Sequence, residues 1–145
     1  MNEKLKVELP LDWNLSKNKA KVPIIVQGKP SIKISNDHLN AINDVRLIVR
    51  AHMNAEGWKP QKKTKTWLFI TVYKKDHTGD AINTTDGLAD AVKREIGIDD
   101  CWFSSLVDWQ ICPKNQQKIL LEIMQVDSNT MIQVTFTQKG DNNEL

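Results

Sequence analysis

The sequence predicts one domain in which short β-strands are combined with two main helices. A chain of 145 residues with 40% apolar content fits a single domain with its own hydrophobic core. Two segments repeat their apolar residues at three- and four-residue steps, as helices do, and several shorter segments are rich in alternating or β-branched residues, as strands are. We therefore expect one domain over residues 1–137, followed by a flexible C-terminal tail over residues 138–145.

The N-terminal part is expected to form three strands and the first helix. Apolar residues alternate with charged ones over residues 5–10, which is the pattern of a half-buried strand that ends at a proline. The stretch 12–21 mixes turn-forming residues with lysines and predicts a basic loop. Residues 22–26 and 31–35 flank a turn and predict a hairpin. Capping side chains then precede apolar residues at helical spacing, which predict a helix that ends at Gly57.

The C-terminal part is expected to hold a central strand, the second helix and a hairpin. Residues 67–73 are almost all apolar and favour β-structure, which is typical of a central strand covered on both faces. Over residues 80–96 the apolar side chains form one helical stripe, and Gly97 ends the helix. Residues 118–126 and 131–137 predict a final hairpin.

The net charge of +2 conceals an asymmetry, because lysines gather before residue 76 and aspartates after it. Clustered lysines suit a polyanion partner, since neutralised phosphates release condensed counterions. Two ordinary solvated surfaces are the alternative interpretation. Residues 57–65 form a second basic loop beside the one at 12–21. These two loops and the end of the central strand supply the lysines that we expect to contact DNA phosphates: Lys17, Lys19, Lys21, Lys62, Lys63, Lys65, Lys74 and Lys75.

Several classes of protein are disfavoured by the composition. No apolar run approaches the roughly 20 residues of a bilayer span, and the charged first residues lack the apolar segment of a signal peptide. We therefore expect a cytoplasmic protein with no membrane partner. Cys101 and Cys112 are too few for a disulfide framework and lack zinc-site spacing. No glycine-rich phosphate loop or nucleophile elbow is present, and no organic cofactor is expected.

The aspartates between residues 80 and 100 are the strongest candidates for chemistry. Asp80 opens the second predicted helix, Asn83, Asp86 and Asp90 share its polar face, and Asp99-Asp100 follow its end. Mg²⁺ favours one or two carboxylates and leaves positions for phosphate oxygens. A helix of about 16 residues is roughly 24 Å long, so Asp80 and Asp100 meet only through the sheet or through a second subunit. Taken singly, each aspartate also fits a cap, a solvated face or a turn.

Residues 79–100 resemble the core of the RusA-type Holliday-junction resolvases, which are small endonucleases of bacteria and phages. Asp80, Asn83, Asp90-Ala91-Val92 and Asp99-Asp100 fall at positions that match the family's motif, and the order of elements is similar over most of the chain. The resemblance implies an α+β fold with a small mixed sheet of about five strands and two main helices. It also implies a homodimer, because a four-way junction needs two symmetric cuts.

The resemblance further implies an endonuclease that uses Mg²⁺, or Mn²⁺ in its place, to resolve Holliday junctions or other branched DNA in recombination and repair. The catalytic candidates are then Asp80, Asn83 and Asp100. The candidate metal ligands are Asp80, Asp86, Asp99 and Asp100.

Two positions depart from the family's pattern. Ile82 stands where the family has its second aspartate, and Asp86 stands where it has a lysine. The first change removes an expected metal ligand, and the second reverses a charge expected near the phosphate, although Asp86 lies one turn beyond Asn83 and could replace the lost carboxylate. Two alternatives therefore stay open: a DNA-binding protein on the same scaffold that no longer cuts, and a phage or mobile-element protein whose aspartate face binds a protein partner.

Overall fold

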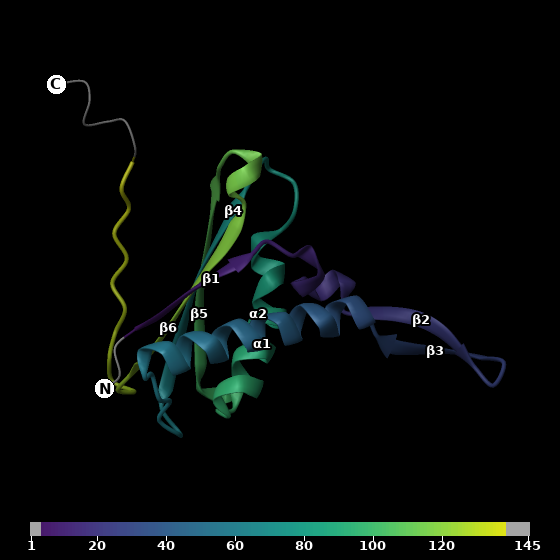
Figure 1. The fold of residues 1–145 in the computed structure, drawn as a ribbon, viewed down its shortest axis with the longest axis horizontal. Helices are drawn as coiled ribbons and strands as arrows, with labels where there is room; N and C mark the ends of the chain where they lie inside the picture. Colours follow the sequence, from purple (N-terminus) through teal and green to yellow (C-terminus); the bar gives the residue numbers. More distant parts are fainter. Residues whose placement is uncertain (1–3, 139–145) are drawn as a thin grey trace.

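The protein has an α+β fold, which a computed structural model describes over residues 4–138 (Figure 1). The described strands form a four-stranded mixed sheet in the order β1-β6-β4-β5 and a separate two-stranded sheet of β2 and β3. The expected fold class, with its small mixed sheet and two main helices, is confirmed. The elements are β1 (Leu5–Pro10), β2 (Lys21–Val26), β3 (Lys29–Ile34), α1 (Asn36–Glu56), β4 (Lys65–Lys74), α2 (Thr85–Ile96), β5 (Phe103–Ile111) and β6 (Lys118–Val126).

The core lies between one face of the four-stranded sheet and the two helices. Alternate residues of β1, β4 and β6 are buried, and they form one cluster with the apolar stripes of α1 and α2. The other face of β4, which carries Trp67, Phe69 and Tyr73, is only half-buried. The expectation that β4 is covered on both faces is therefore wrong, because both helices contribute to the core on one side of the sheet.

The central strand and the second helix belong to a crossover unit. β4 pairs in parallel with β5 from Thr66 opposite Phe103 to Lys74 opposite Ile111, and α2 connects the two strands. On its other side β4 pairs antiparallel with β6. Strand β5 was not among the elements expected from the sequence, and its insertion makes β4 an interior strand.

The predicted terminal hairpin is wrong. Residues 127–138 form no regular secondary structure, although a turn is closed by the Thr130 amide, which donates to the Asp127 carbonyl at 2.9 Å. β6 already pairs with β1 on one side and with β4 on the other, so no free edge remains for a returning strand. Of the predicted tail, residues 139–145 lie outside the described residues.

The predicted N-terminal hairpin is confirmed and projects from the body of the protein (Figure 1). Its two-residue turn is Gln27-Gly28, with positive φ at both positions, so Lys29 and Pro30 belong to β3 rather than to the turn. Such a turn matches the twist of paired strands.

The helix ends follow from capping side chains. Ser35 Oγ accepts a hydrogen bond from the His38 amide at the start of α1, and Gly57 ends the helix in a left-handed conformation. The second helix begins at Thr85 rather than at Asp80, because Ala81–Thr84 form a 3₁₀ helix, η3. Among the described residues, no helix has the length and apolar character needed to cross a membrane.

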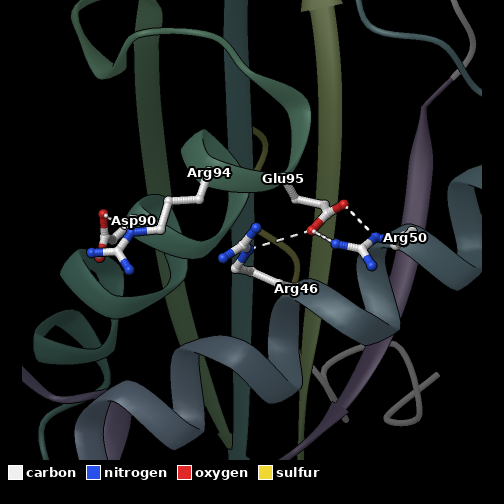
Figure 2. A network of polar contacts seen from close by, with 5 residues as sticks. All are labelled: Arg46, Arg50, Asp90, Arg94 and Glu95. Carbon is white, nitrogen blue, oxygen red and sulfur yellow. Dashed lines mark hydrogen bonds and ion pairs between the residues drawn. The ribbon is translucent and has the colours of Figure 1, made fainter.

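An ion-pair network joins the two helices (Figure 2). Arg50 donates through Nε to Glu95 Oε2 at 2.7 Å and through a terminal nitrogen to Oε1 at 3.1 Å, and Arg46 Nε lies 3.4 Å from Oε1. The Glu95 side chain is only 9% exposed. The hydrogen bond from Arg50, followed by the charges of both arginines, lowers the pKa of Glu95 from its ordinary value.

We expect Glu95→Gln to lower the free energy of unfolding by about 1–2 kcal/mol near neutral pH, since charge-assisted hydrogen bonds to a mostly buried carboxylate are lost. Because the native pKa of Glu95 is lowered, its contribution is present above the ordinary value of 4.5 and is lost as the pH falls through the native value. Urea unfolding of both proteins at neutral and acidic pH checks this. Asp90→Asn is the control, because its pair with Arg94 is exposed within one helix. An equal deficit at both pH values would contradict the assignment.

Candidate functional site

The turn between β4 and Asp80 is held by contacts of Lys74 and Gly79. The buried Lys74 is 4% exposed, its ammonium donates to the Gly79 carbonyl at 2.8 Å, and it lies 4.7 Å from the centre of the Trp109 ring. Gly79 has φ +82°, and a Cβ there would come within 2.6 Å of the Trp13 ring. This close packing fixes the backbone directly before Asp80.

Asp80 presents its carboxylate at the surface. It precedes η3 in an extended conformation and makes no capping hydrogen bond with its side chain. Its Oδ2 instead accepts a hydrogen bond from Asn83 Nδ2 at 3.2 Å. Ile82, between them, is 69% exposed. The side chains of Asp80 and Asn83 therefore lie together, and the position that departs from the family's pattern is open to solvent.

The helix α2 continues this acidic surface toward the basic N-terminal loop. A Cβ on Gly87 would lie 2.4 Å from the Leu15 carbonyl oxygen, so glycine permits α2 to approach the 3₁₀ helix η1 (Trp13–Leu15) closely. As a result, Asp86 and Asp90 line one open hollow together with Lys17 and Lys21.

Two further hollows adjoin the first. Lys19 lines one of them with Asp80 and Asn83, and Lys17 lines the other with Asn83 and Asp86. We call Asp80, Asn83, Asp86 and Asp90 the acidic strip, and Lys17, Lys19 and Lys21 the N-terminal lysines. The sequence predicts Asn83, Asp86 and Asp90 on one helix face, joined by Asp80 at its start, whereas the position of the strip beside the N-terminal lysines depends on tertiary packing.

His38 belongs to the same region and was missed from the sequence. It is buried in the first turn of α1, lines the hollow of Asp86 and Asp90, and has its Nδ1 2.6 Å from the Asn14 carbonyl oxygen. Because a carbonyl only accepts, Nδ1 carries the proton. A single histidine at a helix start has no sequence signal that could reveal this contact.

Asp99 and Asp100 lie at the other end of α2. Lys93 Nζ lies 3.9 Å from Asp99 and 3.7 Å from Asp100. A side-chain hydrogen bond with Asp100, the amide of Cys101 and the charge of Lys93 lower the pKa of Asp99. Lys62 donates to the Gly97 carbonyl at 2.8 Å, so the second basic loop reaches this end of the helix.

Within one chain, the sheet does not bring Asp80 and Asp100 together. Asp80 follows the end of β4, whereas Asp100 precedes β5 and so lies beside the start of β4, because the two strands are parallel. Over residues 4–138, no three His, Cys, Asp or Glu side chains are grouped so that they could hold a metal ion. Asp80 and Asp86 offer the oxygen ligands that Mg²⁺ prefers. A site that also includes Asp100 requires a second subunit, and that expectation stays a prediction.

The other lysines predicted to contact DNA differ in their exposure and in their distance along the fold from the acidic strip. Lys74 is engaged by carbonyl groups inside the protein and is not open to a phosphate. Lys75 follows it in the exposed turn. Lys62, Lys63 and Lys65 lie near the start of β4, and Lys62 contacts Gly97, which follows α2 and precedes Asp99.

No protein-family model matches the chain, and no curated protein shows significant similarity to it. The fold and the site alone therefore define its class: an α+β domain that presents carboxylate and amide oxygens beside lysines.

Proposed function

We propose that this protein is a metal-dependent endonuclease of the RusA type, which acts in the cytoplasm as a homodimer on branched DNA. The observation that carries the proposal is the acidic strip beside the N-terminal lysines. Lys17 and Lys19 line hollows that also contain Asp80, Asn83 and Asp86. Metal-dependent cleavage of a phosphodiester uses oxygen ligands for the metal and cations for the adjacent phosphates, and this surface offers both.

The side chains have distinct roles in this proposal. Asp80 and Asp86 would hold the metal, and Asn83 orients Asp80 through its 3.2 Å hydrogen bond. Mg²⁺ or Mn²⁺, when bound, supplies polarisation of the phosphate and a lowered pKa of bound water. The N-terminal lysines hold neighbouring phosphates, and Asp99 and Asp100 of a second protomer complete the ligand set.

A second candidate is a branched-DNA-binding protein that does not cut. The exposed Ile82 favours it, because the resemblance implies a metal-binding aspartate at this position. A protein partner bound by the acidic strip is the third candidate, and it differs from the others because it requires no affinity for DNA.

A cleavage assay on a four-way DNA junction with a titration of Mg²⁺ and Mn²⁺ tests the proposal. We expect metal-dependent cutting of the junction and little cutting of a linear duplex with the same sequence. Binding without cutting at every metal concentration would favour the second candidate, above all if Ile82→Asp combined with Asp86→Lys gains cleavage. Absence of DNA binding at low salt would leave the protein-partner candidate.

A further inference from the structure

The segment that follows β6 has the composition of a strand but no strand partner within residues 4–138 of its own chain. Ile132, Val134 and Phe136 alternate with polar residues, and residues 128–138 carry no charged side chain. The apolar side chains are nevertheless in solvent, with Met131 89% and Phe136 95% exposed. Alternation of this kind is typical of a strand with one covered face.

In the structure this segment pairs with neither edge of the described four-stranded sheet. Both sides of β6 are occupied, and the turn at residues 127–130 is closed by a hydrogen bond. A closed turn spans less than about 7 Å, whereas a strand beyond β1 or β5 would lie two or three spacings of about 4.8 Å from β6. The segment is therefore available to another molecule.

The edge strand β5 offers a matching acceptor. It spans nine residues, pairs only with β4 among the described strands, and has no buried residue. Leu106, Trp109 and Ile111 are exposed on it. The opposite edge, β1, is shorter, exposes Lys6 and Glu8 and ends in Pro10, features that protect an edge from pairing.

We propose that residues 131–137 of one protomer add as a β-strand to the edge of β5 in a second copy of this chain, and that the exchange is reciprocal. A second copy is the favoured occupant because the same chain carries both the unpaired segment and the unpaired edge, so that two copies satisfy each other and the assembly closes with two-fold symmetry. The uncharged segment meets no charge repulsion. The added strand also lies near Ile82, which lines a hollow with Leu106 and Val107.

The oligomeric state of the full chain, measured by light scattering without DNA or metal, tests this inference. We expect twice the 16.6 kDa of one chain, together with slow hydrogen exchange over residues 131–137. Val134→Pro removes a strand hydrogen bond, and Leu106→Lys places a charge on the acceptor edge, so each should return the mass to that of one chain. Gln138→Pro, beyond the proposed strand, is the matched control and should leave the dimer intact.

Three results would overturn the inference: a monomer at every concentration, a dimer whose residues 131–137 exchange at unstructured rates, or a dimer that survives either Val134→Pro or Leu106→Lys. Circular dichroism of the variants identifies any that fail to fold, and the exchange measurement on the unmodified chain does not depend on them. No cleavage is measured in this test. A monomer at every concentration would also contradict the homodimer of the nuclease proposal, whereas a dimer that fails either of the other two criteria would overturn only the strand exchange.

Discussion

Replacing Asp80 by Asn is expected to abolish junction cleavage while DNA binding is retained. The Asp80 carboxylate is exposed, its only described side-chain partner is Asn83, and it therefore remains available to a cation. A bound metal supplies several kcal/mol of charge stabilisation and each 1.36 kcal/mol is tenfold in rate, so we expect a loss on the order of 100- to 1000-fold. Single-turnover cleavage and a binding isotherm, measured on the same junction, separate the two effects.

Asp90→Asn is the matched control for this substitution. Asp90 lies on the same acidic strip, but Arg94 of the same helix binds its carboxylate at 3.1 Å. We expect this variant to cut nearly as fast as the unmodified protein. If both variants lost cleavage equally, the charge of the strip rather than a specific ligand at Asp80 would be responsible, and the proposed role of Asp80 would fail.

Replacing the three N-terminal lysines by alanine is expected to weaken junction binding and to flatten its salt dependence. If Lys17, Lys19 and Lys21 each contact one phosphate, the slope of log affinity against log salt concentration falls by about 2.7, that is, three times 0.9. Fluorescence anisotropy over a range of salt concentrations measures this slope.

The control is a triple variant that removes the same number of positive charges elsewhere. Lys4, Lys6 and Lys118 each lie near a carboxylate of β1 or β6, at 3.1, 4.0 and 2.9 Å. Their replacement by alanine should change the slope much less. Equal slopes for the two triple variants would show that net charge, and not the surface beside the acidic strip, determines binding.

Local patterns were enough to predict β1, the β2–β3 hairpin, α1 and the central position of β4. Strand β5 could not be predicted in this way, because its sequence mixes serines, an aspartate and apolar residues without alternation. The terminal hairpin was wrong for a non-local reason: residues 131–137 do favour a strand, but β6 has no free edge. Sequence patterns report what a segment prefers and not which edges other strands have occupied.

The sequence was enough to predict which acidic residues belong to the candidate site, but not which other segments lie beside them. Asn83, Asp86 and Asp90 share one surface because they are three and four residues apart along η3 and α2. Asp80 precedes η3 in an extended conformation and joins them through its hydrogen bond with Asn83. The approach of the N-terminal lysines depends on Gly87 and on the packing of η1, which no local pattern encodes. Lys74 follows an apolar strand and continues its alternation, and so its side chain is buried.

The most direct test of the nuclease account mixes two inactive variants. If Asp80 of one protomer and Asp100 of the other form each site, a dimer of Asp80→Asn with Asp100→Asn has both substitutions in one site and none in the other. In an equimolar mixture half of the dimers are then mixed, and each mixed dimer has one intact site of two. About a quarter of all sites should therefore be intact and should nick four-way DNA, although each variant alone is inactive. A mixture as inactive as its components, with exchange of subunits demonstrated, would contradict a site shared between protomers.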